Sequence, residues 1–237
     1  MLDIEKVQCK NIASFCGLLK ELDITEGTTS DGRGYVRGSA KIGVDSEIDG
    51  KVVENEHIIK MFAMRNKTDG TPNVMYDKIL GYREQFTSAA VVEDISQASF
   101  VKVTGRVEEN SYYDDKSKMI RSGYQFTGSF LNKKKPSDEE GATFEVQGVV
   151  AKMREETDRN GDPTDRLIIS MVVIGFAGRA DVIEFVAAGR AKTYIEENWN
   201  QGDTVIATGK IISTFRTITW EEEQGFGDPI KRIRTEG

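Results

Sequence analysis

Apolar residues along the chain gather in short segments that are rich in β-branched and aromatic residues and bounded by polar or glycine-containing turns, a pattern typical of β-strands. Such segments recur in the same order in the two halves of the chain. They span 14–21, 35–44, 57–64, 100–107 and 120–131 in the first half, and 143–154, 167–174, 181–188, 204–211 and 229–235 in the second. A segment compatible with a helix follows the third strand of each set, at 86–95 and 190–199. The pattern therefore predicts a duplicated unit of five strands and one helix.

This order of elements is that of the OB-fold, a small Greek-key barrel of five strands. The fourth strands of the two sets both end in T-G-[RK]-[VI], at 104–107 and 208–211. Between the halves, 133–141 holds a basic run, a proline and an acidic run without apolar periodicity, which indicates a linker. We predict an all-β chain of two tandem five-stranded OB-folds, at 1–132 and 142–237. The alternative is that two antiparallel β domains share their turn spacings by accident.

The composition excludes several kinds of chemistry. The chain has 237 residues, a formal net charge of −7, two cysteines and one histidine. Cys9 and Cys16 are too few for a disulfide framework, and His57 alone cannot build a Ser/His/Asp relay or a multi-histidine metal centre. We predict a protein that is not an enzyme and holds neither a cofactor nor a metal. His57 is expected at the surface, at the start of the third strand.

The apolar segments are too short for a membrane span, and the first ten residues lack the features of a secretory signal. The sequence therefore predicts a cytoplasmic protein with no membrane partner.

An ordered set of features marks the segment 181–211. A strand first leads into Gly189 and Arg190. An amphipathic helix follows, with Ala191 near its start and Tyr194, Ile195 and Trp199 on its inner side. Gly202 then precedes the next strand, and Gly209 lies near the end of that strand. This order resembles the bacterial single-stranded-DNA-binding protein family. The resemblance implies an OB-fold protein that coats single-stranded DNA in replication, recombination or repair, with replication or recombination proteins as further partners. Because that family usually assembles four barrels, it also implies a homodimer.

The sequence departs from the family at several points. Ala188 and Val182 stand where the family often places aromatic residues that stack on bases, and the family's acidic C-terminal tail has no counterpart before Gly237. Recruitment of partners through such a tail is therefore not expected. This divergence agrees with a phage or prophage origin.

Binding of single strands without sequence specificity needs exposed aromatic rings for the bases and cations for the phosphates. The hairpin between strands four and five of the first half offers both. Its candidate residues are Tyr112, Tyr113, Lys116, Lys118 and Arg121. Tyr124, Phe126 and Phe130 share parity in the fifth strand and are expected on one face, most of it barrel core, with Tyr124 wet at the open end.

Basic residues on the strands supply the expected path for phosphates. They are Arg37, Lys41, Lys60, Lys102 and Arg106 in the first half, and Lys152, Arg190 and Lys210 in the second. Phe215 and Arg216 form a candidate stacking and phosphate pair in the last hairpin. Stacking and phosphate contacts do not distinguish DNA from RNA, nor do they say which half binds more tightly.

A second interpretation comes from the charge, since neither half is basic. The chain would then be an OB-fold scaffold, such as a virion or replisome component, that contacts proteins and holds no nucleic acid.

Overall fold

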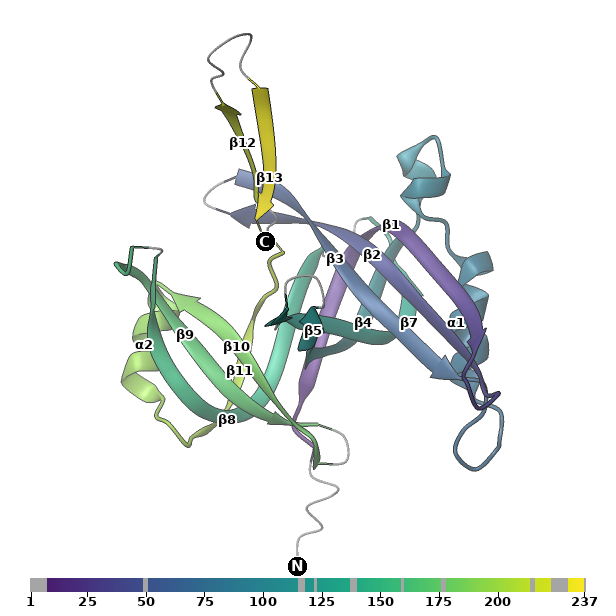
Figure 1. Cartoon of the computed structure of the whole chain (residues 1–237), viewed down its shortest axis with the longest axis horizontal. Coiled ribbons are helices and arrows are strands. Elements are labelled where there is room, and N and C mark those ends of the chain that lie inside the picture. The colour runs from purple at the N-terminus through teal and green to yellow at the C-terminus, as the bar shows by residue number, and fades with distance from the viewer. Residues whose placement is uncertain are drawn as a thin grey trace, which may run out of the picture.

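The computed structural model describes residues 8–48, 51–114, 118–121, 123–136, 140–158, 160–175, 178–213, 216–222 and 230–236. Most of these residues form β-strands. The strands gather in two bodies, one from each half of the chain, and a hairpin near the C-terminus projects away from both (Figure 1). The all-β class predicted from the sequence is therefore confirmed.

The first half forms a closed barrel of five strands. These are β1 (Asn11–Thr28), β2 (Gly34–Ile48), β3 (Lys51–Met64), β4 (Phe100–Glu109) and β7 (Tyr124–Lys133). They pair in the ring β1–β2–β3–β7–β4–β1, antiparallel except for a short parallel contact between β3 and β7. This closure is the predicted OB-fold. Between β4 and β7 the strands β5 (Tyr112–Asp114) and β6 (Met119–Arg121) form a separate hairpin.

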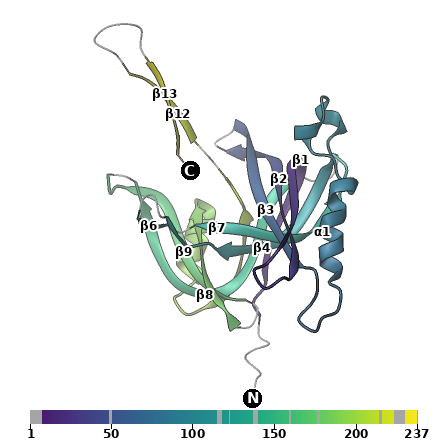
Figure 2. The ribbon, with the colours of Figure 1, turned by 45° about the vertical axis from the view of Figure 1, so that its right-hand side comes forward.

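Alternating residues of these strands fill the barrel. Phe15, Leu19, Ile42, Ile59 and Val101 are fully buried, and such burial is the main stabilising contribution in a core of this kind. Helix α1 (Val74–Gln85) packs against the barrel, as Figure 2 shows, through Tyr76, Ile79 and Tyr82.

The helix predicted at 86–95 is wrong, because Phe86 is already the C-cap of α1 and only short 3₁₀ helices follow, η2 (Ala89–Val91) and η3 (Ile95–Gln97). The true helix escaped prediction because its three buried residues form a weak apolar stripe among mixed neighbours.

The second half repeats the strand order of the first, but its described strands do not close into a ring. Its elements are β8 (Gly141–Thr157), β9 (Pro163–Ile174), β10 (Ala180–Ala188), α2 (Arg190–Asn198) and β11 (Thr204–Lys210). The order β10–β9–β8–β11 matches β3–β2–β1–β4, and α2 lies where the sequence predicts a helix. On α2 Ile195 is buried, whereas Tyr194, which we expected on the inner side, is 59% exposed.

The strand predicted at 229–235 exists, but it does not join the second sheet. It is β13 (Ile230–Glu236), which pairs with β12 (Arg216–Glu222) in a hairpin of its own. This hairpin follows β11 as the β5–β6 hairpin follows β4, so the sequence pattern of a hairpin arm was mistaken for a fifth barrel strand. Among the described residues no strand bridges β10 and β11.

One antiparallel contact makes the two halves a continuous sheet. Asn11–Cys16 of β1 pairs with Gly141–Val146 of β8, with Ala13 opposite Phe144. Gly105 lies opposite Ala13, and Gly209 lies opposite Phe144, so the two T-G-[RK]-[VI] motifs occupy equivalent places. A Cβ at Gly105 would collide with the carbonyl oxygen of Thr127, which explains the glycine there. The division into units at 1–132 and 142–237 stays a prediction.

The helices in the described part of the chain are too short or too polar to cross a membrane.

Candidate nucleic-acid interface

The outer surfaces of β2 and β3 form one exposed face. Across this pair Arg37 lies opposite Phe62, Ser39 opposite Lys60, and Lys41 opposite Ile58. Residues 57, 59, 61 and 63 of β3 point into the barrel and are buried, so the alternation of the strand turns these positions outward. We call Arg37, Lys41, Ile58, Lys60 and Phe62 the first face.

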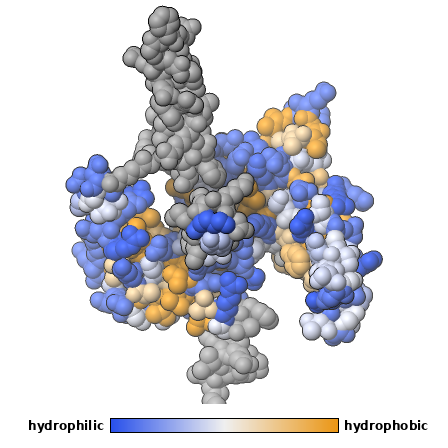
Figure 3. Space-filling model, viewed as in Figure 1, coloured by the Kyte–Doolittle hydropathy of each residue, from blue (hydrophilic) through white to orange (hydrophobic). Residues whose placement is uncertain are grey.

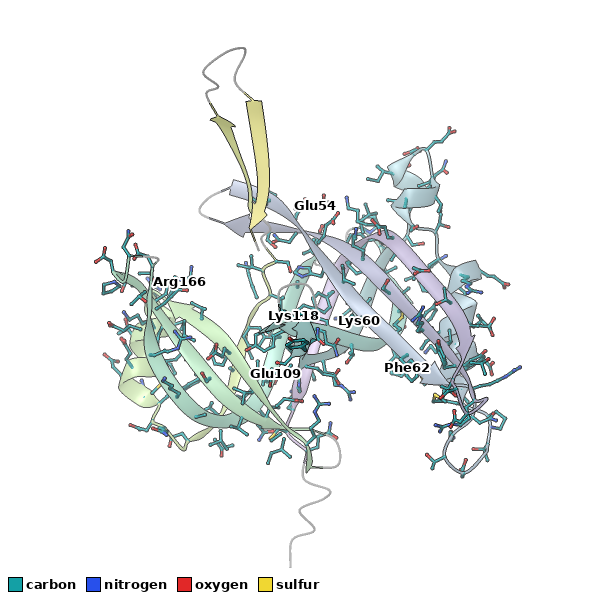
Figure 4. All side chains as sticks on the ribbon, in the orientation of Figure 1. Glu54, Lys60, Phe62, Glu109, Lys118 and Arg166 are labelled. Atoms are coloured by element: carbon teal, nitrogen blue, oxygen red, sulfur yellow. The ribbon has the colours of Figure 1, made fainter. Side chains whose placement is uncertain are left out.

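A cationic row continues from this face across the next two strands. Lys60 of β3 lies beside Thr127 of β7, and Thr127 lies opposite Arg106 of β4. The row borders an open groove of about 550 Å³ that is also lined by Phe62 and Phe130. The side chain of Phe62 is 59% exposed and that of Phe130 is 47% exposed. Figure 4 labels Lys60 and Phe62 following one another along β3.

The charges in the groove are partly balanced. The Lys60 Nζ lies 3.0 Å from Gln125 Oε1, and the Arg106 Nε donates to Glu108 Oε1 at 2.6 Å. Gln125 Nε2 in turn lies 3.3 Å from Glu108 Oε2, so one carboxylate serves a network with two cations. Single-stranded nucleic acid is bound by such combinations, because each exposed ring can stack on a base while each cation attracts a phosphate.

Phe62 and Phe130 show where alternation along a strand predicts the direction of a side chain correctly and where it does not. Phe62 was not singled out, although its spacing of two from Lys60 places both on one face. Phe130 was expected to share a face with Phe126, yet Phe126 packs on Phe15 with ring centroids 4.8 Å apart. The pairing of β4 with β7 skips one residue between Gly128 and Phe130, and this bulge turns Phe130 outward. There the Lys78 Nζ lies 4.4 Å from the centroid of its ring.

The predicted binding hairpin is β5–β6, which lies between the two halves in Figure 1. Tyr112 pairs with Arg121 through the backbone, and the side chain of Tyr113 is 56% exposed. Lys118 is exposed and has a positive φ of 56°. Lys116 lies outside the described residues, as do the side chains of Tyr112 and Arg121.

Tyr124 has a role that the sequence did not indicate. Its hydroxyl oxygen accepts the backbone N–H of Glu184 in β10 at 2.8 Å, although the side chain is 43% exposed. Burial raises the pKa of this hydroxyl. Tyr124 therefore joins the base of the β5–β6 hairpin to the second half, in addition to being partly wet as expected.

Two predicted cations of the first half differ in availability. The Lys41 Nζ lies 2.5 Å from Glu21 Oε1 and 3.7 Å from Glu56 Oε2. The hydrogen bond with Glu21 raises the pKa of Lys41, so its charge is already matched by carboxylates. Arg37 is exposed, and its Nε lies 3.2 Å from the hydroxyl oxygen of Thr25.

The remaining predicted residues are spread over other surfaces. Lys102 lines a depression at the junction of the halves, Lys152 is exposed opposite Ser170, and Lys210 is exposed opposite Thr143. Arg190 begins α2 and is exposed. Phe215 lies outside the described residues, as does the side chain of Arg216, the first residue of β12. The structure thus brings Lys60 and Arg106 together and leaves the second-half cations apart from that groove.

Comparison with known proteins agrees with this architecture. A family model described as YorF matches residues 10–237. The chain belongs to the YorF family. A search of curated proteins finds no match to the sequence.

Solved structures similar to this YorF chain include the wild-type single-stranded DNA binding protein from Thermus aquaticus, with a TM-score of 0.54 and 13% identity over 97% of this chain and 93% of that chain. A deletion mutant of the Thermus aquaticus protein gives a TM-score of 0.54 and 12% identity over 97% and 94%. At such identities the similarity shows the fold, and it confirms the resemblance found in 181–211 at that level.

Proposed function

We propose that the chain binds single-stranded DNA without sequence specificity and catalyses no reaction. The observation that carries the proposal is the groove lined by Lys60 and Arg106 together with the exposed rings of Phe62 and Phe130. OB-folds that bind single strands combine a cationic groove with stacking rings in this way. The fold shared with the Thermus aquaticus protein, whose name states this ligand, supports the same assignment.

The finer setting follows from the resemblance in the sequence. We propose that the protein coats single strands during replication, recombination or repair, and that two copies associate as a homodimer.

The test is a fluorescence-anisotropy titration at low and moderate salt. The probes are a labelled oligothymidine of about 30 nucleotides, long enough for two barrels at roughly 4–16 nucleotides each, an oligouridine of equal length and a DNA duplex. We expect tight binding to the single-stranded DNA, weak binding to the duplex and a loss of affinity with salt. No binding to any probe at low salt would contradict the proposal and favour the protein scaffold.

Variants locate the site. Lys60→Ala with Arg106→Ala should weaken binding and reduce its salt dependence, whereas Lys192→Ala, which removes a cation on α2 that is paired with Asp165, should not.

In the hairpin, Tyr112→Ala with Tyr113→Ala should weaken binding by about 1–3 kcal/mol if these rings stack on bases. Unchanged affinity would exclude the hairpin, and the groove variants would still test the site on the barrel.

A further inference from the structure

A second depression lies where the two halves join. It measures about 350 Å³ and is lined by Lys102, Lys134 and the hydroxyl groups of Ser14 and Thr143. The pairing of β4 with β1, and of β1 with β8, holds these strands side by side. Lys210 of β11 lies opposite Thr143, which brings a third lysine to the same part of the sheet.

The lysines of this depression have few acidic partners. Within the described ranges neither Lys102 nor Lys134 forms an ion pair. Glu140 also lines the depression, but its carboxylate accepts the backbone N–H of Asp45 at 2.7 Å. Lys102 is only partly exposed, and a partly buried charge is costly unless it is paired. An external anion would satisfy both lysines and the neighbouring hydroxyl groups.

The outer face of β4 borders both the depression and the groove of the first half. Side chains of β4 alternate between its two faces. The outer face carries Lys102, Thr104 and Arg106, while the core is filled by Val101, Val103 and Val107. Thr104 and Arg106 line the groove, and Lys102 lines the depression. Arg106 lies four positions along the strand from Lys102, which corresponds to about 13 Å. One extended polyanion can therefore contact both places.

A second copy of the chain is the competing occupant of this surface. In a two-fold interface centred on this depression, the lysines of one copy would face the lysines of the other. Like charges placed together in this way are unfavourable. The charges therefore favour nucleic acid over self-association at the depression.

We infer that a single strand bound in the groove continues along the outer face of β4 and crosses the junction of the two halves, where Lys102 and Lys134 bind its phosphates. The inference rests on the proposed function. It assigns the path of the strand from the first half towards the second.

The experiment compares the whole chain with Lys102→Gln/Lys134→Gln. The matched control is Arg33→Gln/Lys192→Gln, which removes the same charge from two residues that are paired with Asp31 and Asp165. Each protein is titrated with labelled oligothymidines from about 6 to about 30 nucleotides, a range that runs from part of one barrel site to two barrels. The longest probe is also titrated over a range of salt concentrations. The molar mass of each protein in solution is measured by analytical ultracentrifugation.

On the longest probe the variant should lose about 1.4 units from the slope of log affinity against log salt, because each phosphate contact on a single strand contributes about 0.7. On the shortest probe that binds, the variant and the natural chain should agree. Equal slopes for variant, control and natural chain on the longest probe would overturn the inference and leave the proposed function standing. A variant that changes its oligomeric mass but not its affinity would assign the surface to a second copy. Failure of the natural chain to bind any probe would overturn the proposed function itself.

Discussion

The third strands of the two halves turn the same positions outward but fill them with different side chains. Ile58, Lys60 and Phe62 of β3 correspond to positions of β10 that hold glutamate, valine and alanine. The correspondence follows from the register, because the bulges after Leu19 of β1 and after Val150 of β8 are equivalent, so that Ile42 matches Met171, and these two residues lie opposite His57 and Ile183. Exposure is similar as well, since Lys60 is exposed and its counterpart Val186 is 46% exposed.

The neighbouring strands differ at one of two cations. Arg37 of β2 corresponds to Arg166 of β9, whereas Lys41 corresponds to Ser170. Figure 3 shows a hydrophobic area on the visible face of the second half, in agreement with the exposed valines of β10. The fold therefore decides which positions face outward, and the side chains at those positions decide the ligand. On this comparison the first face suits a polyanion and its counterpart in the second half does not.

The largest expected effect concerns an inward position of these strands, which holds His57 in β3 and Ile183 in β10. His57 is 1% exposed and lies against Phe15, with ring centroids 5.1 Å apart, and Ile183 is 5% exposed. Neither ring nitrogen of His57 has a hydrogen-bond partner among the described atoms, and burial lowers its pKa to about 4. The expectation of a surface histidine is therefore wrong.

This burial makes the stability of the first barrel depend on pH. In the unfolded chain His57 binds a proton below about pH 6.5, while the folded chain resists protonation until about pH 4. The neutral His57 therefore makes its full contribution to the free energy of unfolding above about pH 6.5. As the pH drops, this free energy falls, by about 3 kcal/mol at pH 4. Urea unfolding at pH 7 and pH 4 measures the loss. In His57→Phe the loss should be smaller by that amount, and an equal loss in both proteins would refute the assignment to His57.

The next effect exchanges a side chain between the two faces. Phe62→Ala installs the residue of the second half, Ala188, and removes a ring that can stack on a base, so affinity for oligothymidine should fall by about 1–3 kcal/mol. Ile58→Ala removes an exposed aliphatic side chain from the same face and is the matched control, for which we expect little change. If the two variants bind alike, Phe62 does not stack on the ligand.

A change of charge in the second half should have a smaller effect. Glu184 accepts a hydrogen bond from the Ser170 hydroxyl at 2.6 Å and stands where the first half has Ile58. Glu184→Gln keeps an acceptor for Ser170 but removes a negative charge beside the path of a strand that reaches the second half. A gain of up to about 1 kcal/mol is expected at low salt, fading at high salt. Absence of any gain at low salt would mean that the strand does not pass over β10.

These features differ in how far the sequence could predict them. The closed barrel and the order of strands could be predicted from the spacing of apolar segments, because side chains alternate between the two faces of a strand with a period of two. The outward turn of Phe130 did not, since a one-residue bulge reverses parity and leaves no mark in the composition. The bond from the Glu184 amide to Tyr124 depends on how the halves meet, which no local pattern encodes.

The site was predictable to the extent that it depends on alternation. Lys60 and Arg106 could be placed on strand surfaces, whereas their alignment through Thr127 needs the parallel contact of β3 with β7. The burial of His57 was missed because a polar residue at the start of a strand resembles a strand end, and only the length of β3, which begins at Lys51, places it inside.

The smallest effect tests a cation of the first face that is already neutralised. Lys41→Val replaces the ammonium by an aliphatic side chain and should change affinity for oligothymidine by less than about 0.5 kcal/mol, because Glu21 and Glu56 already hold the ammonium. The same titration of Lys60→Ala supplies the contrast, since among the residues that the structure describes Lys60 bonds to the amide of Gln125 and to no carboxylate. A loss for Lys41→Val as large as that for Lys60→Ala would show that Lys41 leaves its carboxylates for a phosphate. The path of the strand would then extend across β2, and exposed ion pairs on this face would count as part of the binding surface.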